Sequence, residues 1–201
     1  EQIRTILCQK GILVKIFISV DLSNDKTYEL CKELENKNHN VKVLPYGKKF
    51  GSAAKNFFHL INEVSFVGFD YIAFSDQDDI WKSNKLQHAT KLIKQNGLDG
   101  YSSDIISLSE NGKENLVKKS YPQKKYDFYF ESAGPGCTYV FKKQSIQKFK
   151  KFLVDNWKEV NLLEFHDWLI YAYFRTQKMK WKIDNIPLMY YRQHRNNVFG
   201  A

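Results

Sequence analysis

The sequence has 201 residues, of which 43% are hydrophobic and 15% aromatic. This is typical of one globular domain with a substantial core and excludes a largely disordered chain. Its formal net charge of +9 favours a polyanionic partner: nucleic acid, an anionic membrane face or a phosphate-bearing ligand. No apolar run approaches the roughly 18 residues that span a bilayer, and no secretory signal is recognisable. The three cysteines form no CxxC pair, which argues against a zinc site and favours a reducing cytoplasm with small, buried thiols.

Helices and strands alternate along the first half of the sequence. Helical spacing of apolar residues predicts helices at 1–9, 23–37, 51–64 and 84–96, the last ending at Gly97. Apolar runs predict strands at 14–20, 40–46 and 70–75. Ser23 and Ser52 are the expected N-caps of the second and third helices. Strands separated by helices indicate right-handed βαβ units and a parallel sheet covered on both faces.

The second half of the sequence has a different pattern. Strands are expected within 100–109, 137–143 and 181–194, partly antiparallel, with a turn at 110–113 and helices at 143–155 and 166–177. We therefore predict a single α/β domain over 1–201, in which about 1–100 and about 101–201 have different tasks. The lysines peak between Lys142 and Lys151, which indicates either a solvated helix face or a surface attracted to anionic lipid.

Three carboxylates, of Asp76, Asp78 and Asp79, directly follow the apolar strand at 70–75. Ligands of open α/β sheets bind at the carboxyl ends of the strands, and Asp21 follows a strand in the same way, so we expect the two acidic turns to share one crevice. A calcium loop is excluded, because Trp81 and Gln87 stand where Gly and Glu are required. Helix capping and a divalent metal site remain. Three adjacent carboxylates repel one another unless a cation joins them, and Mg²⁺ or Mn²⁺ there would neutralise a diphosphate leaving group.

The acidic stretch FSDQDDIW is followed by NKL, and five further stretches stand around it: EQIRTILCQ, ISVDLSNDKT, GPGCTYVF, HDWLIYAYF and YRQHRNNVFG. Together, and in this order, they resemble the motifs of family-2 inverting glycosyltransferases of the GT-A fold. The resemblance is closest to the branch of bacterial rhamnosyl- and other hexosyltransferases of surface-polysaccharide synthesis. It implies a Rossmann-like, mixed and mainly parallel sheet flanked by helices, with nucleotide-sugar binding in the first half and acceptor binding in the second.

The resemblance also implies roles for single residues on the donor side. Asp78 would bind Mn²⁺ or Mg²⁺, Asp76 would contact the metal or the ribose, and Asp79 would orient the site or touch the donor sugar. Asp21 would contact the nucleobase, and His194 would reach the metal or the diphosphate. Donor contacts are also expected from Asn56, Asp104, Arg192 and Arg195. The alternative for Asn56 is helix packing, that for Asp104 is a turn, and that for both arginines is a solvated surface.

On the acceptor side, Asp167 matches the inverting base, although it could instead cap the helix that follows it. Gly134, Gly136 and Thr138 are expected to form a backbone surface against the sugars, since glycine permits close approach. Trp81 and Trp168 could stack on sugar rings or pack in the core.

Two departures from the family's pattern bear on these roles. The family opens with a strand and a Thr/Ser-Tyr/Phe-Asn turn, and the sequence begins at Glu1 without them, so we expect the first strand of the fold to be missing. Val20 and Leu22 replace an acidic residue and a glycine of the nucleotide turn, which makes the contact of Asp21 less secure than the metal role of Asp78.

The leading functional expectation is an inverting, metal-dependent glycosyltransferase. It would move a sugar from a nucleotide-diphosphate donor to a glycan hydroxyl, on a lipid-linked precursor at the cytoplasmic membrane face, with peripheral contact to anionic lipid. The alternative is a catalytically silent homologue that binds nucleotide or glycan. No nucleic-acid partner is expected, because no nucleic-acid motif is found.

Overall fold

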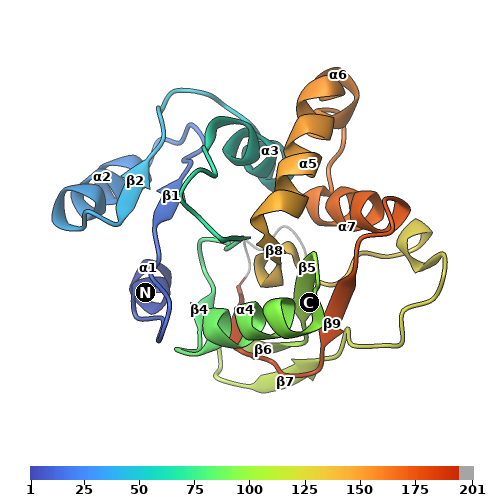
Figure 1. The fold of residues 1–201 in the computed structure, drawn as a ribbon. Coiled ribbons are helices and arrows are strands. Elements are labelled where there is room, and N and C mark those ends of the chain that lie inside the picture. The colour runs from blue at the N-terminus through green and yellow to red at the C-terminus, as the bar shows by residue number, and fades with distance from the viewer. Residues whose placement is uncertain (195–201) are drawn as a thin grey trace. The chain divides into compact units, whose positions relative to one another are not determined.

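The computed structural model describes residues 1–194 (Figure 1). Its first half contains α1 (Gln2–Leu7), β1 (Ile16–Ile18), α2 (Thr27–Lys37), β2 (Val41–Val43), α3 (Ala53–Glu63), β3 (Tyr71–Ala73), β4 (Ile80–Trp81) and α4 (Lys85–Asn96). The second half contains β5 (Gly100–Ser103), β6 (Ile105–Ser109), β7 (Glu114–Val117), the 3₁₀ turns η1 (Asp127–Tyr129) and η2 (Gly136–Thr138), β8 (Val140–Lys142), α5 (Lys143–Asp155), α6 (Trp157–Val160), α7 (His166–Thr176), β9 (Trp181–Asp184) and β10 (Met189–Gln193).

The chain forms two compact units. Among the described residues, unit 1 comprises 1–12, 68–146 and 167–194, and unit 2 comprises 13–67 and 147–166. Each unit therefore takes segments from both sides of the divide near residue 100, and the assignment of donor and acceptor binding to the two halves stays a prediction. No helix within 1–194 is long and apolar enough to cross a membrane.

Unit 2 is built on the parallel pair β1–β2, in which Ile16 is opposite Val41. Helix α3 buries one apolar face, including Phe57, Phe58 and Ile61. As predicted, the Ser52 hydroxyl caps this helix by accepting a bond from the backbone N–H of Lys55 at 3.3 Å. The cap residue fixes where the helix begins, and the apolar face fixes which side is turned to the core.

The prediction that Ser23 caps α2 is wrong. The helix begins at Thr27, and the carboxylate of Asp25 accepts both the Thr27 backbone N–H and the Ser23 hydroxyl at 2.9 Å. These bonds hold the pKa of Asp25 below its ordinary value. An ionised carboxylate is the stronger acceptor, so Asp25 holds the helix start and Ser23 supports it from one turn earlier.

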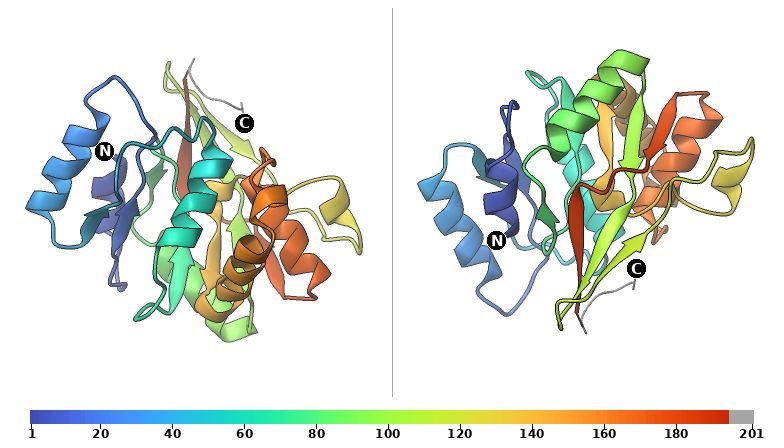
Figure 2. Two further views of the ribbon diagram at one scale, coloured as in Figure 1. Left: turned by 90° about the horizontal axis from the view of Figure 1, so that it is seen from above. Right: turned by 90° about the horizontal axis from the view of Figure 1, so that it is seen from below.

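Unit 1 contains two four-stranded sheets, in the orders β3-β8-β5-β9 and β4-β10-β6-β7. Figure 2 shows β10, drawn in red, between β4 and β6. Among the described strands of both units, three pairings are parallel and four antiparallel. The prediction of a mixed α/β sheet is confirmed, but not its mainly parallel character. β8 and β10 enter from the second half of the chain and pair antiparallel with β3 and β4.

The core of unit 1 is aromatic and surrounds Trp181. The rings of Tyr139, Tyr171 and Phe174 meet that indole edge-on, with centroids 4.9–5.3 Å away. Gly100 is required beneath it, because a Cβ there would lie 2.3 Å from Trp181 Cε3. This packing joins β5, β9 and α7 and so fixes the helix that carries Asp167.

The cysteines and the lysine-rich helix differ in part from expectation. Cys137 is buried as predicted, but Cys8 is exposed and Cys31 half-buried. Helix α5 buries Ile146, Phe149 and Leu153 fully and leaves most of its lysines on the other faces.

Candidate functional site

The acidic loop after β3 is fixed at both ends. Antiparallel pairing places the start of β8 beside the end of β3, and Phe74 donates its backbone N–H to Tyr139 O at 3.1 Å. At the other end, β4 pairs with β10, and the Trp81 N–H donates to the Thr5 hydroxyl of α1 at 3.1 Å. The carboxylates between these points therefore have defined positions.

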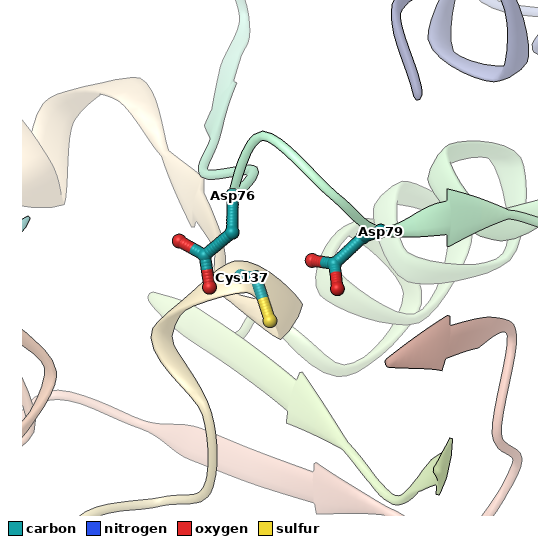
Figure 3. Close-up of side chains that lie close together, drawn as sticks. All are labelled: Asp76, Asp79 and Cys137. Carbon is teal, nitrogen blue, oxygen red and sulfur yellow. The ribbon is translucent and has the colours of Figure 1, made fainter. Parts of the chain in front are cut away.

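Asp76 and Asp79 meet Cys137 at the centre of this loop. One ligand atom from each of the three side chains lies within 4.8 Å of the others, and Figure 3 shows the two carboxylates on either side of the thiol. Cys137 reaches this position because η2 immediately precedes β8. Carboxylates and thiolates bind divalent cations, so the group is a possible metal site that the sequence analysis did not include in full.

Burial dominates the electrostatics of this cluster. Burial and the neighbouring charges of Asp78 and Asp167 raise the pKa of Asp76 to about 6. Burial and the charge of Asp76 raise the pKa of Asp79 to about 8. Asp79 is 0% exposed, and neither of its oxygens has a hydrogen-bond partner within the described chain apart from the nearby thiol. Burial also raises the pKa of the Cys137 thiol well above its ordinary value, so this sulfur is protonated at neutral pH.

Asp78 pairs with His194. The imidazole Nε2 lies 2.7 Å from Asp78 Oδ2, with the histidine side chain 33% exposed and the aspartate 12%. Arg192 donates from Nε to the backbone carbonyl of Asp78, and its Nη1 lies 3.6 Å from a Glu1 carboxylate oxygen. The structure thus brings Arg192 and His194 to Asp78, although His194 follows Asp78 by 116 positions in the sequence. Arg195 lies outside the described residues.

Lys85 is a member of the cluster that the sequence analysis missed. Its side chain is buried in the first turn of α4, with Nζ 3.8 Å from the centroid of the Trp81 ring and 3.4 Å from Cys137 O. The charge of Asp79 acts on it, while burial lowers its pKa to about 8. Trp81 is itself buried, so it packs against this ammonium group and not against solvent.

Tyr191 of β10 is a second missed residue. Burial and then the charge of Asp76 raise its pKa, which places its hydroxyl in the field of the same carboxylates. No local pattern marks either residue, because lysines are mostly exposed and tyrosines are buried to very different extents.

Asp167 stands in the first turn of α7. Its Oδ1 accepts the backbone N–H of Trp168 at 2.8 Å, and its backbone carbonyl accepts the Tyr139 hydroxyl at 3.4 Å. Burial raises its pKa, although Ser132 and Lys119 act in the opposite direction. Because its charge also raises the pKa of Asp76, the structure brings the expected base and the acidic loop together.

The other expected acceptor residues make contacts within the chain. Trp168 donates its indole N–H to Phe128 O at 2.7 Å. Thr138 is fully buried, with its hydroxyl donated to Pro135 O at 2.7 Å, and Gly136 is buried beside it. Gly134 has φ +100°, a conformation that favours glycine. Contacts of these residues with a sugar stay predictions.

The carboxylate of Asp104 accepts hydrogen bonds from within the chain. Its Oδ1 accepts the backbone N–H groups of Lys119 and Ser120 at 2.6 and 2.8 Å, and Oδ2 accepts the Ser120 hydroxyl at 2.9 Å. The carboxylate therefore anchors the start of the loop that leads to Ser132. A contact with donor or acceptor hydroxyls stays a prediction.

Asp21 and Asn56 belong to unit 2. The Asp21 carboxylate accepts three backbone N–H groups, from Leu22 at 2.9 Å, Phe50 at 2.6 Å and Gly51 at 2.8 Å. Asn56 donates to Ser19 O at 3.2 Å and buries an oxygen that has no partner in the described chain. His166, which precedes the expected base, stacks on Phe57 at 4.2 Å, and burial lowers its pKa to about 3.

A cavity of about 700 Å³ lies elsewhere in unit 1, lined by β3 and α4 residues including Tyr71, Thr90 and Ile93. It includes none of the expected site residues, so the candidate site is defined by the side-chain cluster.

Residues 1–154 match the family described as glycosyl transferase family 2. The chain belongs to this family of glycosyltransferases. Over its whole length it is 44% identical to dTDP-rhamnosyl transferase RfbG of Shigella flexneri and covers 70% of that protein. This confirms the resemblance drawn from the sequence motifs.

Solved structures show the same fold. The chain matches S. aureus TarS 1–349 in complex with UDP with a TM-score of 0.67 at 17% identity, covering 96% of this chain and 56% of that one. TarS 1–349 in complex with UDP-GlcNAc matches with a TM-score of 0.64 at 15% identity. The family assignment and the fold are thus established for a chain that spans a little over half of these solved structures.

Proposed function

We propose that the protein transfers a sugar from a nucleotide-diphosphate donor to a glycan hydroxyl, with inversion at the anomeric carbon, in cell-surface polysaccharide synthesis. The observation that carries this proposal is the gathering of Asp76, Asp78, His194 and Asp167 in one unit. The 44% identity to a protein named dTDP-rhamnosyl transferase supports dTDP-rhamnose as the donor.

We assign a divalent cation, Mn²⁺ or Mg²⁺, to Asp78 and His194, which lie 2.7 Å apart, with Asp76 as the further ligand that the sequence resemblance implies. The Asp78–His194 pair is partly exposed, which suits a cation that keeps water and substrate phosphates among its ligands. The group of Asp76, Asp79 and Cys137 suits it less, because its thiol is protonated at neutral pH and hard cations prefer oxygen. When bound, the cation would neutralise charge on the departing diphosphate.

Other residues of the chain would hold the donor. Arg192, beside Asp78, can offer its guanidinium to phosphate. Asp79, buried next to Asp76, would orient the loop. Asp21 has three of its roughly four acceptor positions occupied by backbone groups, which supports a main role in shaping the nucleotide turn, with one position left for a nucleobase. Asn56, whose amide oxygen is buried without a partner in the described chain, would also contact the donor.

Asp167 would act as the base. It would take the proton of the acceptor hydroxyl as the new bond to the anomeric carbon forms and the bond to the diphosphate breaks. A carboxylate of ordinary pKa, about 3.9, is a weak base, and burial of Asp167 raises its pKa. The side chain would therefore be a stronger base than an exposed aspartate. We place Gly136, Thr138 and Trp168 on the acceptor side.

The acceptor would be a lipid-linked glycan at the cytoplasmic membrane face. A silent homologue is the second candidate, motivated by Val20 and Leu22 in the nucleotide turn. The raised pKa values of Asp76 and Asp167 favour an enzyme, because perturbed acids cluster at functional sites.

The test is to follow nucleotide release from dTDP-rhamnose with a glycan acceptor, with Mn²⁺ or with a chelator, and to determine the anomeric configuration of the product by NMR. Metal-dependent release of dTDP with an inverted product is expected. Retention of configuration, or equal turnover in chelator, would contradict the mechanism. Donor binding without turnover would assign the chain to the silent class.

A further inference from the structure

The loop at residues 118–131, here called the aromatic–lysine loop, exposes four aromatic side chains. Tyr121 is 59% exposed, Tyr126 53%, Tyr129 66% and Phe130 81%. Figures 1 and 2 draw this loop in yellow, extending beyond β9 and α7. A group of large apolar side chains left in water is a feature that calls for a partner.

This exposure does not result from a loosely held loop. Asp104 holds its start through Lys119 and Ser120, and the Trp168 indole donates to Phe128 O. Arg175 of α7 donates from Nη2 to Lys124 O at 2.8 Å. The loop is therefore anchored by the buried Asp104 and the half-buried Trp168 and Arg175, while four of its aromatic side chains are exposed.

The charge of the loop is positive. Lys118, Lys124 and Lys125 are exposed. The ammonium group of Lys118 lies 5.0 Å from the centroid of the Tyr121 ring, and that of Lys125 lies 4.8 Å from the centroid of the Tyr126 ring. The acidic Asp127 is neutralised by Arg175, whose Nη1 lies 2.9 Å from its Oδ1. Only Glu131 remains as an exposed acid within the segment 118–131.

We propose that the aromatic–lysine loop binds the surface of an anionic lipid bilayer. Tyrosine and phenylalanine favour the interface between head groups and acyl chains, and lysines add attraction to anionic head groups. A neutral glycan would explain the aromatic rings but not the lysines. The anchors on Trp168 and Arg175 link the loop to α7, so that lipid binding would bring the helix of Asp167 to the membrane.

This proposal goes beyond transferase activity and does not depend on it, because lipid binding needs neither donor nor metal. It also replaces the lysine-rich helix α5 as the basic surface of interest. That helix has lysines but buries Ile146, Phe149 and Leu153 fully and exposes only Val154 among its large apolar side chains, and its Lys151 is paired with Asp155 at 2.8 Å.

The test is co-sedimentation with vesicles of phosphatidylcholine, alone or mixed with phosphatidylglycerol. The loop variant K118Q/K124Q/K125Q is compared with the matched control K148Q/K151Q/K158Q, which removes the same charge from exposed positions of α5 and α6. Lys119 is left unchanged because it acts on Asp167. The variant Y129S/F130S tests the aromatic contribution, and thermal melting confirms that every variant folds.

Wild type is expected to bind only the vesicles that contain phosphatidylglycerol, less strongly as salt rises. The loop variant should bind on the order of 100-fold more weakly, at about fivefold per lysine, and Y129S/F130S should also weaken binding. The control should resemble wild type. The proposal is overturned if wild type does not bind these vesicles, or if the control weakens as much as the loop variant. It is also overturned if the loop variants keep vesicle binding and instead lose binding to a soluble acceptor oligosaccharide.

Discussion

Two acidic turns follow strands in this chain, and the fold uses them differently. In unit 2, the carboxylate of Asp21 accepts three backbone N–H groups. In unit 1, Asp79 is buried without such donors and Asp76 has a raised pKa. The first arrangement stabilises a loop, and the second keeps carboxylates in an unfavourable state that a cation would relieve. Backbone N–H groups that fill the oxygens of an acid after a strand therefore indicate a structural role, as at Asp21.

The largest expected effect comes from Asp167, the base that we propose. Asp167→Asn should lower the transfer rate by roughly 10²–10⁴-fold, the range that general base catalysis contributes, while dTDP binding and thermal stability stay near wild type. Steady-state rates and calorimetric binding on the same preparations check this. If the Asp167→Asn variant kept the wild-type transfer rate, Asp167 would not be the base.

The second effect concerns metal binding. Asp78→Asn should weaken Mn²⁺ affinity by at least about 10-fold, since even the loss of a residue that supports a ligand costs about 10–100-fold. Cys137→Ser, the matched change in the other group, should leave the affinity nearly unchanged. Wild-type affinity should fall as pH drops below about 6, where Asp76 becomes protonated. Mn²⁺ titrations from pH 5 to 8 measure both. The opposite ranking of the two variants would move the metal to the buried group of Asp76, Asp79 and Cys137.

The third effect is a pH dependence of stability in chelator. The folded-state pKa of Asp79 is about 8 and its unfolded value about 3.9, so the folded state binds the extra proton between these values. Stability should therefore fall as pH rises from about 4 to 8. Asp79→Asn, which cannot ionise, should flatten this fall. Urea unfolding across the range measures it, and an unchanged slope in the variant would show that Asp79 is not the group responsible.

The smallest effect tests the other acidic turn. Asp21→Ala should destabilise the protein by about 1–2 kcal/mol, because three backbone N–H groups, of which that of Phe50 is part-buried, lose their acceptor. Its effect on Mn²⁺ affinity should be slight. Asp25→Ala, which removes a helix-capping carboxylate from the same turn, is the matched control and should also lower stability, without any effect on Mn²⁺ affinity. A large loss of nucleotide binding by Asp21→Ala without loss of stability would reverse the contrast between the two turns.

Local chemistry was predictable from the sequence where one residue decides it. Ser52 caps α3, and Gly97 ends α4 in the left-handed conformation at φ 59°, because hydroxyl acceptors and glycine suit those positions. Ser23 failed because Asp25, two residues later, is the stronger acceptor. Strand pairing was less predictable, since the antiparallel entry of β8 and β10 depends on contacts distant in sequence.

The site was predictable in part for the same reason. The sequence identified the acids of the loop and His194, and the structure pairs Asp78 with His194. It could not identify Lys85 or Tyr191, because burial depends on the surrounding fold. Nor could it show that the carboxylates of Asp21 and Asp104 are occupied by neighbouring N–H groups.

The most direct measurement is calorimetric titration of dTDP into wild type, Asp78→Asn and Asp21→Asn, each with and without Mn²⁺. We predict that wild type binds dTDP more tightly with Mn²⁺, that Asp78→Asn loses this enhancement, and that Asp21→Asn keeps it. Binding by wild type that does not depend on Mn²⁺, or an enhancement that Asp21→Asn loses and Asp78→Asn keeps, would contradict the assignment of the metal to the acidic loop after β3.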